Sequence, residues 1–239
     1  MTQPETLKSV EQYLHLKAPF GAFRPFQSGS YRSTTPVPSP SVVYGLLLNL
    51  AGIEQRTDLS VPVTKIRKNL PKIAIAIAIP EGCQSQTALL SQQLHQYLVG
   101  NSDKELSQKT HGAKAWIAPV RREVLVNLEL VVGFKTEQWL CDRIIAGLNG
   151  ELEESRYGLP FAGDNNFLFD SIEPIAQPPL ARWYCLLDHG TRPNRGICRL
   201  SIWINREDNS KTKTAVFAPS HFVLNPPELA WIQIPIESN

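Results

Sequence analysis

Apolar and polar residues alternate with a period of two over residues 10–17, which predicts a half-buried strand with one polar and aromatic face. The loop at residues 18–38 is rich in Pro, Gly and Ser, so no long regular element is expected there. Ser39 and Pro40 then provide an N-cap and a first helical position, and apolar residues follow at helical spacing as far as Gly52. This pattern predicts the first helix.

Isoleucine and alanine alternate over residues 73–79, so this strand has a large and a small face, and we expect another segment to approach the alanines closely. Residues 81–115 are long and polar, with a single apolar-periodic piece, and are interpreted as an insertion. Strand alternation resumes at residues 124–132, and a helix is expected from Thr136 to Gly150.

The order strand, helix, strand, strand, helix, with a further strand at residues 167–174, predicts an α+β fold with a ferredoxin-like βαββαβ core. Short strand candidates separated by turns follow, which favours a second, small antiparallel β-sheet. We therefore expect a domain at residues 1–177, interrupted by the insertion at 81–115, and a C-terminal β subdomain at residues 178–239.

Composition narrows the function classes. The chain has 239 residues, 42% of them hydrophobic, and 24 Lys and Arg against 22 Asp and Glu, so any nucleic-acid site must be local. Its four cysteines form no C-x-x-C pair and its five histidines have no metal-ligand spacing, so we expect reduced thiols, no metal and no cofactor. The N-terminus resembles no signal peptide and no apolar run has membrane-spanning length, so a cytoplasmic protein without membrane contact is expected.

The loop that leads into the first helix is a candidate phosphate site. A helix start offers unpaired N–H groups and a positive dipole end, and polar and basic residues surround this one: Arg24, Tyr31, Arg32, Ser39 and Ser41. The rings of Phe20, Phe23 and Phe26 are candidates for stacking on unpaired bases. In the alternative interpretation the phenylalanines fix the loop to the core and the arginines are solvated; the sequence leaves both open.

The stretch "KAPFGAFRPF…YRSTTPVPSPSVVYGLLLNLAG" at residues 17–52 resembles the N-terminal signature of the Cas-five family of CRISPR-associated RAMP proteins. In addition, "VRREVLVNLELVVGF" is similar to the family's second characteristic strand, and "YGLPFAGDNNFLFDSIEPI" resembles its glycine-containing loop, with sparser glycines. Residues from 178 onward match no part of that pattern.

This resemblance implies a noncatalytic subunit of a type I Cascade complex, which serves either antiviral defence or another form of RNA-guided DNA targeting. An RRM-like palm would bind the 5′ handle of crRNA, cap the filament of backbone subunits and dock the large subunit, near the PAM of the target DNA. The insertion at residues 81–115 would be the family's thumb. The RNA-binding residues expected on this basis are Lys17, Phe23, Arg24, Tyr31, Arg32, Ser39, Ser41, Tyr44, Lys109, His111, Lys114, Arg121 and Arg122.

Several of these residues have an alternative interpretation. Arg121 and Arg122 begin a strand, where they either contact RNA or protect a sheet edge from pairing. Lys17 shares a polar strand face with Tyr13 and His15, which either stacks bases or is covered by the C-terminal strands. A Gly/Pro loop with Arg192, Arg195 and Arg199 either contacts RNA, DNA or the large subunit, or is solvated.

Two other functions remain open. One branch of the family cuts precursor crRNA without a metal, and Tyr44, His111 and Lys114 are the residues that would form such a catalytic set here. The other alternative is a ferredoxin-like scaffold for protein interactions, because this fold hosts many functions.

Overall fold

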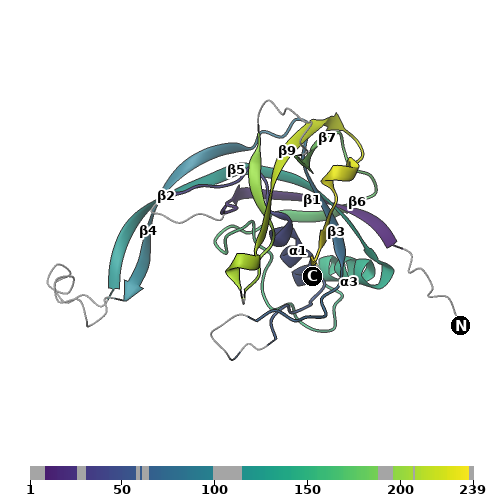
Figure 1. Ribbon diagram of the computed structural model, residues 1–239, viewed down its shortest axis with the longest axis horizontal. Helices are drawn as coiled ribbons and strands as arrows, with labels where there is room; N and C mark the ends of the chain where they lie inside the picture. Colours follow the sequence, from purple (N-terminus) through teal and green to yellow (C-terminus); the bar gives the residue numbers. More distant parts are fainter. Residues whose placement is uncertain are drawn as a thin grey trace, which may run out of the picture.

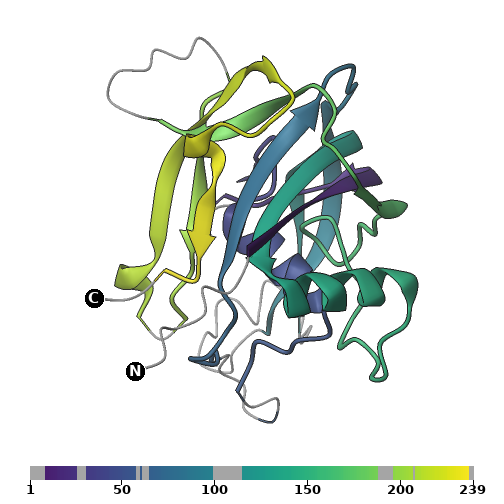
Figure 2. The same ribbon diagram turned by 90° about the vertical axis from the view of Figure 1, so that its right-hand side faces the viewer.

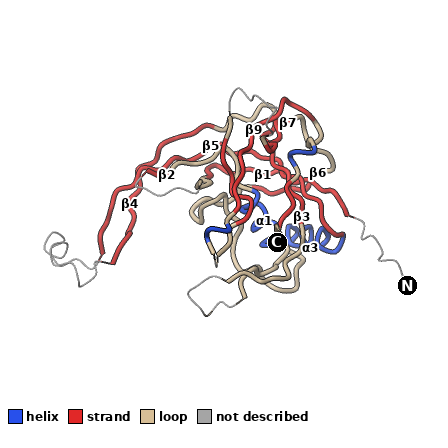
Figure 3. Tube along the Cα trace, in the orientation of Figure 1, coloured by secondary structure: helices blue, strands red, loops and turns tan. Residues whose placement is uncertain are grey.

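The computed structural model describes residues 9–25, 31–57, 60, 65–98, 115–187, 196–206 and 208–236. This part of the chain has an α+β architecture in which strands predominate and two α-helices lie together (Figures 1 and 3). The elements are, in chain order, β1 (Ser9–Gly21), β2 (Tyr31–Arg32), α1 (Pro40–Leu50), β3 (Ile73–Pro80), β4 (Gln86–Leu98), β5 (Ala115–Glu137), α3 (Gln138–Asn149), β6 (Ser171–Ile175), β7 (Ala181–Leu186), β8 (Cys198–Trp203), β9 (Lys213–Val223) and β10 (Ile232–Ile234).

Both helices cover the same face of four antiparallel strands, which lie in the order β6-β1-β5-β3. β1 contributes Leu14 and Leu16 to this face, and each is at most 1% exposed. They share one core with Leu47 of α1 and Ile144 of α3. The period-two pattern predicted for β1 is confirmed, and each fully buried leucine stabilises the fold by roughly 1.5–3 kcal/mol.

The ends of both helices follow local signals. α1 begins after Ser39, whose backbone is extended, with Pro40 in its first turn as predicted. α3 ends at Gly150 with φ +75°, also as predicted, and it begins at Gln138, two residues after Thr136, near which the start was expected. Thr136 still pairs with Val10 in the β1–β5 ladder, which delays the helix. Neither helix, nor any other in the described residues, is long and apolar enough to cross a bilayer.

The C-terminal strands continue the main sheet, so the prediction of a separate small sheet is wrong. β3 pairs with β5 along one edge, and its other edge is shared by β7, through Ala78 and Trp183, and by β10, through Ile75 and Ile232. β9 and β8 extend the sheet beyond β7. An open edge of β3 would expose unpaired backbone groups, and these two strands satisfy them. Figure 2 shows the C-terminal strands beside the helix-covered part. The boundary predicted at residues 177–178 stays a prediction.

The alanine face of β3 is closely packed, as expected. Ala76 and Ala78 are fully buried on the side of the sheet opposite the helices, where Trp183 and Tyr13 cover them. The rings of Trp183 and Tyr13 meet edge to face, with 6.2 Å between their centroids. Only a side chain as small as alanine leaves room for this second, smaller core.

The expected insertion is a long hairpin rather than an irregular segment. β4 pairs with the first half of β5 from Gln86 opposite Val126 to Leu98 opposite Ala115, and Figure 1 shows the hairpin extending away from the rest of the molecule. Leu89 is 58% exposed and Leu90 is 43% exposed. With neither side of this part of the hairpin fully buried, β4 lacks the alternation by which a strand is recognised.

Candidate nucleic-acid interface

The glycine-containing loop at residues 157–169 is held tightly against the end of β1. Ala22 donates its backbone N–H to the carbonyl of Ala162 over 2.9 Å. Gly163 has φ +83°, and a Cβ there would lie 2.2 Å from the carbonyl oxygen of Ala22, so this position requires glycine on two counts. The loop therefore has a fixed place beside the segment that carries the family resemblance.

Arg122 connects β5 to this loop from inside the protein. Its Nη2 atom lies 2.7 Å from Oδ2 of Asp164, its guanidinium lies 5.5 Å from the ring centre of Phe167, and the residue is only 6% exposed. Burial alone would raise the pKa of Asp164, but hydrogen bonds from Asn166 and Arg122 outweigh it and hold this pKa below its usual value. The predicted RNA contact of Arg122 is therefore not supported, because its charge is already matched.

Two predicted aromatic residues also lie in the core. Phe23 is 3% exposed, which agrees with the alternative expectation that this ring fixes the loop. Tyr44 is 1% exposed, its hydroxyl donates to the carbonyl of Pro71 over 2.8 Å, and burial raises its pKa. In this conformation neither ring is open to a base. Phe20 is 44% exposed and packs against Phe167, with 6.0 Å between the ring centroids.

Two exposed members of the predicted set, Tyr31 and Arg121, meet where β2 pairs with β5. Tyr31 pairs with Arg121 in the parallel β2–β5 ladder, and both residues are exposed. The hydroxyl of Tyr31 donates to Glu123 over 2.6 Å, and the same carboxylate accepts the backbone N–H of Thr34 over 3.0 Å. The hydrogen bond to Glu123 is the main cause that raises the pKa of Tyr31. We call Tyr31 and Arg121, together with the exposed Arg24 on the segment that leads from β1 to β2, the β2–β5 strip.

The predicted set also includes Arg32 and the two serines at the start of α1. Arg32 pairs with Arg122 in the ladder and is partly exposed. Ser39 makes no side-chain hydrogen bond to the backbone of the helix; its hydroxyl instead lies 2.9 Å from that of Ser41. Both hydroxyls and the positive end of the helix dipole are thus placed at the start of α1.

Lys17 lies on the other side of the sheet and is not brought together with the α1 start. Its Nζ atom is 3.7 Å from Oε1 of Glu129, and Nε2 of His15 is 2.8 Å from the same atom. Tyr13, on the same strand face, is covered by Trp183. The alternative expectation, that C-terminal strands cover this face, therefore holds at Tyr13.

The remaining predicted residues divide into two groups. Lys109, His111, Lys114, Arg192 and Arg195 lie outside the described residues. Arg199 lies on β8, where its Nη1 atom donates to Oγ1 of Thr214 over 3.2 Å. In the residues that the structure covers, no group of three or more His, Cys, Asp or Glu could hold a metal ion.

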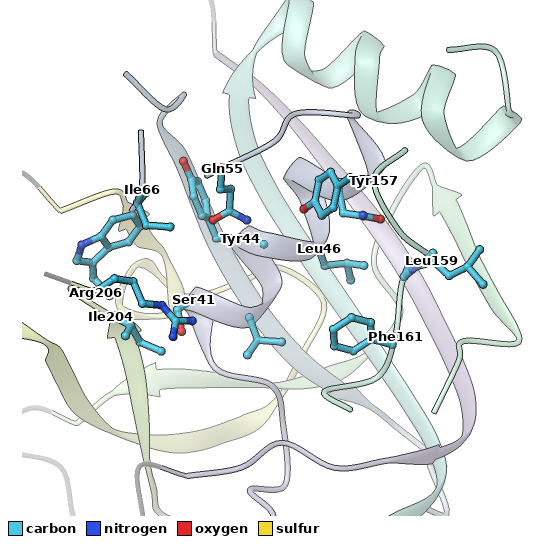
Figure 4. A pocket seen from close by; sticks show the side chains of 15 residues that line it. Ser41, Tyr44, Leu46, Gln55, Ile66, Tyr157, Leu159, Phe161, Ile204 and Arg206 are labelled. Atoms are coloured by element: carbon cyan, nitrogen blue, oxygen red, sulfur yellow. The ribbon is translucent and has the colours of Figure 1, made fainter. Parts of the chain in front are cut away.

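Sequence reasoning missed a hollow on the outer side of α1. It has a volume of about 320 Å³ and is lined by the helix, by residues 157–161 and by the end of β8 (Figure 4). Its residues come from segments far apart in the sequence, so no local pattern could have revealed it. One lining residue, Ile66, lies in a cluster of Lys and Arg at residues 65–72, on the connection between α1 and β3.

Two solved structures resemble the chain over most of its length. One, described as a CRISPR RNA-guided surveillance complex, matches 92% of this chain and 96% of the other, with 13% sequence identity and a TM-score of 0.49. A second, described as a Cas protein, matches 90% and 95%, with 14% identity and a TM-score of 0.44. No family model and no curated protein matches the chain.

Proposed function

We propose that this chain is a noncatalytic subunit of a type I CRISPR effector complex that binds the 5′ handle of crRNA. In the complex it caps the filament of backbone subunits and docks the large subunit. The observation that carries the proposal is the β2–β5 strip, in which Arg24, Tyr31 and Arg121 are exposed on and beside the segment that resembles the Cas-five signature.

The topology supports the assignment of a palm and a thumb. β1, β3, β5 and β6 are antiparallel in the order β6-β1-β5-β3, with both helices on one face, which is the arrangement of a ferredoxin-like palm. The projecting β4–β5 hairpin takes the part of the thumb. Arg121 of the β2–β5 strip lies on β5, the long strand that also forms one arm of the hairpin. RNA bound at the strip would therefore contact the thumb.

The chemistry of the strip suits a short unpaired RNA. Arg24 and Arg121 supply positive charge to phosphates, and the Tyr31 ring, 43% exposed, is free to stack on a base. The hydrogen bond from Tyr31 to Glu123 fixes the direction of the ring before RNA arrives. The hydroxyls of Ser39 and Ser41 add hydrogen-bonding groups at the start of α1.

One observation, at Tyr44, supports the noncatalytic part of the proposal. A metal-independent ribonuclease needs side chains that reach the ribose and the phosphate. Tyr44, one of three candidates, is buried and donates its hydroxyl to a backbone carbonyl, so it offers no support for cleavage.

The proposal is tested by incubating the purified chain with labelled repeat RNA from its own locus in EDTA, with and without the backbone subunit. Native and denaturing gels are then run side by side. We expect retarded, intact RNA. Arg24→Ala/Arg121→Ala should weaken binding about 10-fold or more at low salt, and should reduce the slope of log K against log salt by about 1.4, at ~0.7 per lost phosphate contact.

The matched control is Arg182→Ala/Lys135→Ala, which removes the same charge from β7 and from the far end of β5. It should bind RNA like the wild type. Equal binding by the strip variant and the wild type would overturn the assignment of the strip. A discrete cut in the repeat RNA would overturn the noncatalytic assignment.

A further inference from the structure

The hollow beside α1 continues into a second, larger one. The second hollow has a volume of about 620 Å³, and the two share Ile66, Trp203, Ile204 and Arg206 in their walls. We call the combined depression the α1 groove. Its first half lies between α1 and residues 157–161, and its second half lies along residues 66–72 and the end of β8.

The second half of the groove is strongly basic. Arg67, Lys68, Lys72 and Arg206 all line it, and none of the described residues that line either half is Asp or Glu. Because the whole chain carries a formal charge of only +2, this is a local concentration of cations. Arg67 is held in place by donating its Nε–H to the carbonyl of Arg56 over 3.0 Å.

Glu54, the acidic residue that the structure describes on the connection between α1 and β3, is already paired with a cation. Arg56 donates to both carboxylate oxygens of Glu54, over 3.0 and 2.8 Å. Glu54 therefore does not offset the charge of Arg67 and Lys68, and the groove keeps a positive potential that suits an anionic chain.

The first half of the groove is aromatic and carries an unsatisfied acceptor. Tyr157 is 45% exposed and Phe161 is 46% exposed, and Figure 4 shows both rings on the same side of the hollow. Asn49 is only 6% exposed, and its Nδ2 donates to the carbonyl of Gly158 over 3.1 Å. Its buried Oδ1 has no hydrogen-bond partner among the described residues.

Each of the four RNA bases has a flat face that can stack on an aromatic ring such as Tyr157 or Phe161. A volume of about 320 Å³ lies within the range of small-ligand pockets, and this half shares walls with the basic half, where phosphates would lie.

We propose that the α1 groove binds a single-stranded nucleic acid, with one base in the aromatic half beside Asn49 and the adjoining phosphates on Arg67, Lys68 and Arg206. The groove is a second site, separate from the β2–β5 strip, and it does not rest on the handle-binding function. Its ligand is either guide RNA or a displaced DNA strand, which share this chemistry.

The test uses the full chain and labelled oligonucleotides of about 10 nucleotides. Three probes are compared by fluorescence anisotropy at low salt: oligo(A) RNA, oligo(A) DNA, and a DNA strand of the same length with abasic sites. Two groove variants are used. Arg67→Ala/Lys68→Ala removes phosphate contacts from exposed residues, and Phe161→Ala removes a stacking ring that is already half exposed.

We expect Arg67→Ala/Lys68→Ala to weaken binding of all three probes about 10-fold and to lower the salt slope by about 1.4 for the single strands. Phe161→Ala should weaken binding of the two base-containing probes at least about 5-fold and leave the abasic strand unchanged. The control Arg182→Ala/Lys135→Ala should match the wild type. A preference for the RNA or for the DNA probe then identifies the source of the ligand.

Both groove variants should also weaken the binding that remains in an Arg24→Ala/Arg121→Ala background, which separates this groove from the β2–β5 strip. The proposal is overturned if the wild type binds none of the probes. It is also overturned if Phe161→Ala binds every probe like the wild type, or if it weakens the abasic strand as much as the others. An equal loss in the control variant would show non-specific attraction and would overturn it as well.

Discussion

Arg121 and Arg122 are neighbours on β5, yet they lie in opposite surroundings. Arg121 is exposed beside Tyr31, whereas Arg122 is buried against Asp164 and Phe167. The reason is the two-residue period of a strand, which turns successive side chains to opposite faces. One arginine is therefore available to a ligand, while the other is part of the structure that positions the loop at residues 157–169.

Two helix glycines show the same contrast. Gly147 of α3 faces α1, and a Cβ there would lie 1.7 Å from the carbonyl oxygen of Leu50. Gly45 of α1 faces the groove, where a Cβ would meet only the side-chain amide of Gln55 at 3.3 Å. Residue type alone therefore does not identify a binding position on this protein, because the side of the element decides the role.

The largest expected effect of breaking this contrast is at Arg122. Arg122→Ala leaves the Asp164 carboxylate without its buried partner, which should lower the free energy of unfolding by about 3–5 kcal/mol. Urea denaturation followed by far-UV circular dichroism measures the change. Arg121→Ala is the control and should change stability by less than about 0.5 kcal/mol. Similar losses in the two variants would contradict the assignment of Arg122 as a buried structural residue and of Arg121 as an exposed one.

A smaller effect is expected at Gly147. Gly147→Ala forces α1 and α3 apart, because the new methyl group would overlap a backbone carbonyl that cannot move alone, and this should cost about 1–3 kcal/mol. Thermal unfolding should show a drop in Tm of about 2–4 °C for each kcal/mol. Gly45→Ala should instead be neutral or stabilise by up to about 1 kcal/mol, since alanine favours a helix interior. An unchanged Tm in Gly147→Ala would show that the helices are not in such close contact.

The elements that could be predicted from the sequence are those with a clear period and a local end signal. β1, α1, β3 and α3 meet this condition, through the alternation at residues 10–17 and 73–79 and through Pro40 and Gly150. β4 does not, because a projecting hairpin exposes residues on both sides. The pairing of β7 and β10 with β3 also escaped prediction, since strand partners distant in sequence leave no local pattern.

The sequence identified the segment that carries the candidate site, but not which residues of that segment are exposed and which are buried. Residues 17–52 contain Arg24 and Tyr31, which are exposed, and Phe23 and Tyr44, which are buried. The sequence shows aromatic and basic residues together, whereas burial depends on how the loop at residues 157–169 and the C-terminal strands pack around them. The ion pair of Arg122 with Asp164 joins two such segments and has no signature of its own.

The smallest of the expected effects concerns the pH dependence of this ion pair. The pKa of Asp164 is lower in the folded chain than its usual value, since its hydrogen bonds from Asn166 and Arg122 outweigh the opposing effect of burial. The ionised carboxylate therefore stabilises the fold above its unfolded-state pKa of about 3.9, and this contribution is lost as the pH falls through the folded-state pKa. Asp164→Asn removes the titration but keeps an oxygen that accepts hydrogen bonds.

The difference in free energy of unfolding between the wild type and Asp164→Asn should thus be largest near neutral pH and should shrink below about pH 4. Urea denaturation at a series of pH values measures it. In an Arg122→Ala background the same substitution should have a smaller effect at neutral pH, because the partner that favours the ionised form is gone. A difference that stayed constant with pH would mean that this contact does not hold Asp164 ionised. Arg122 would then stabilise the loop at residues 157–169 by packing against Phe167 rather than by its charge.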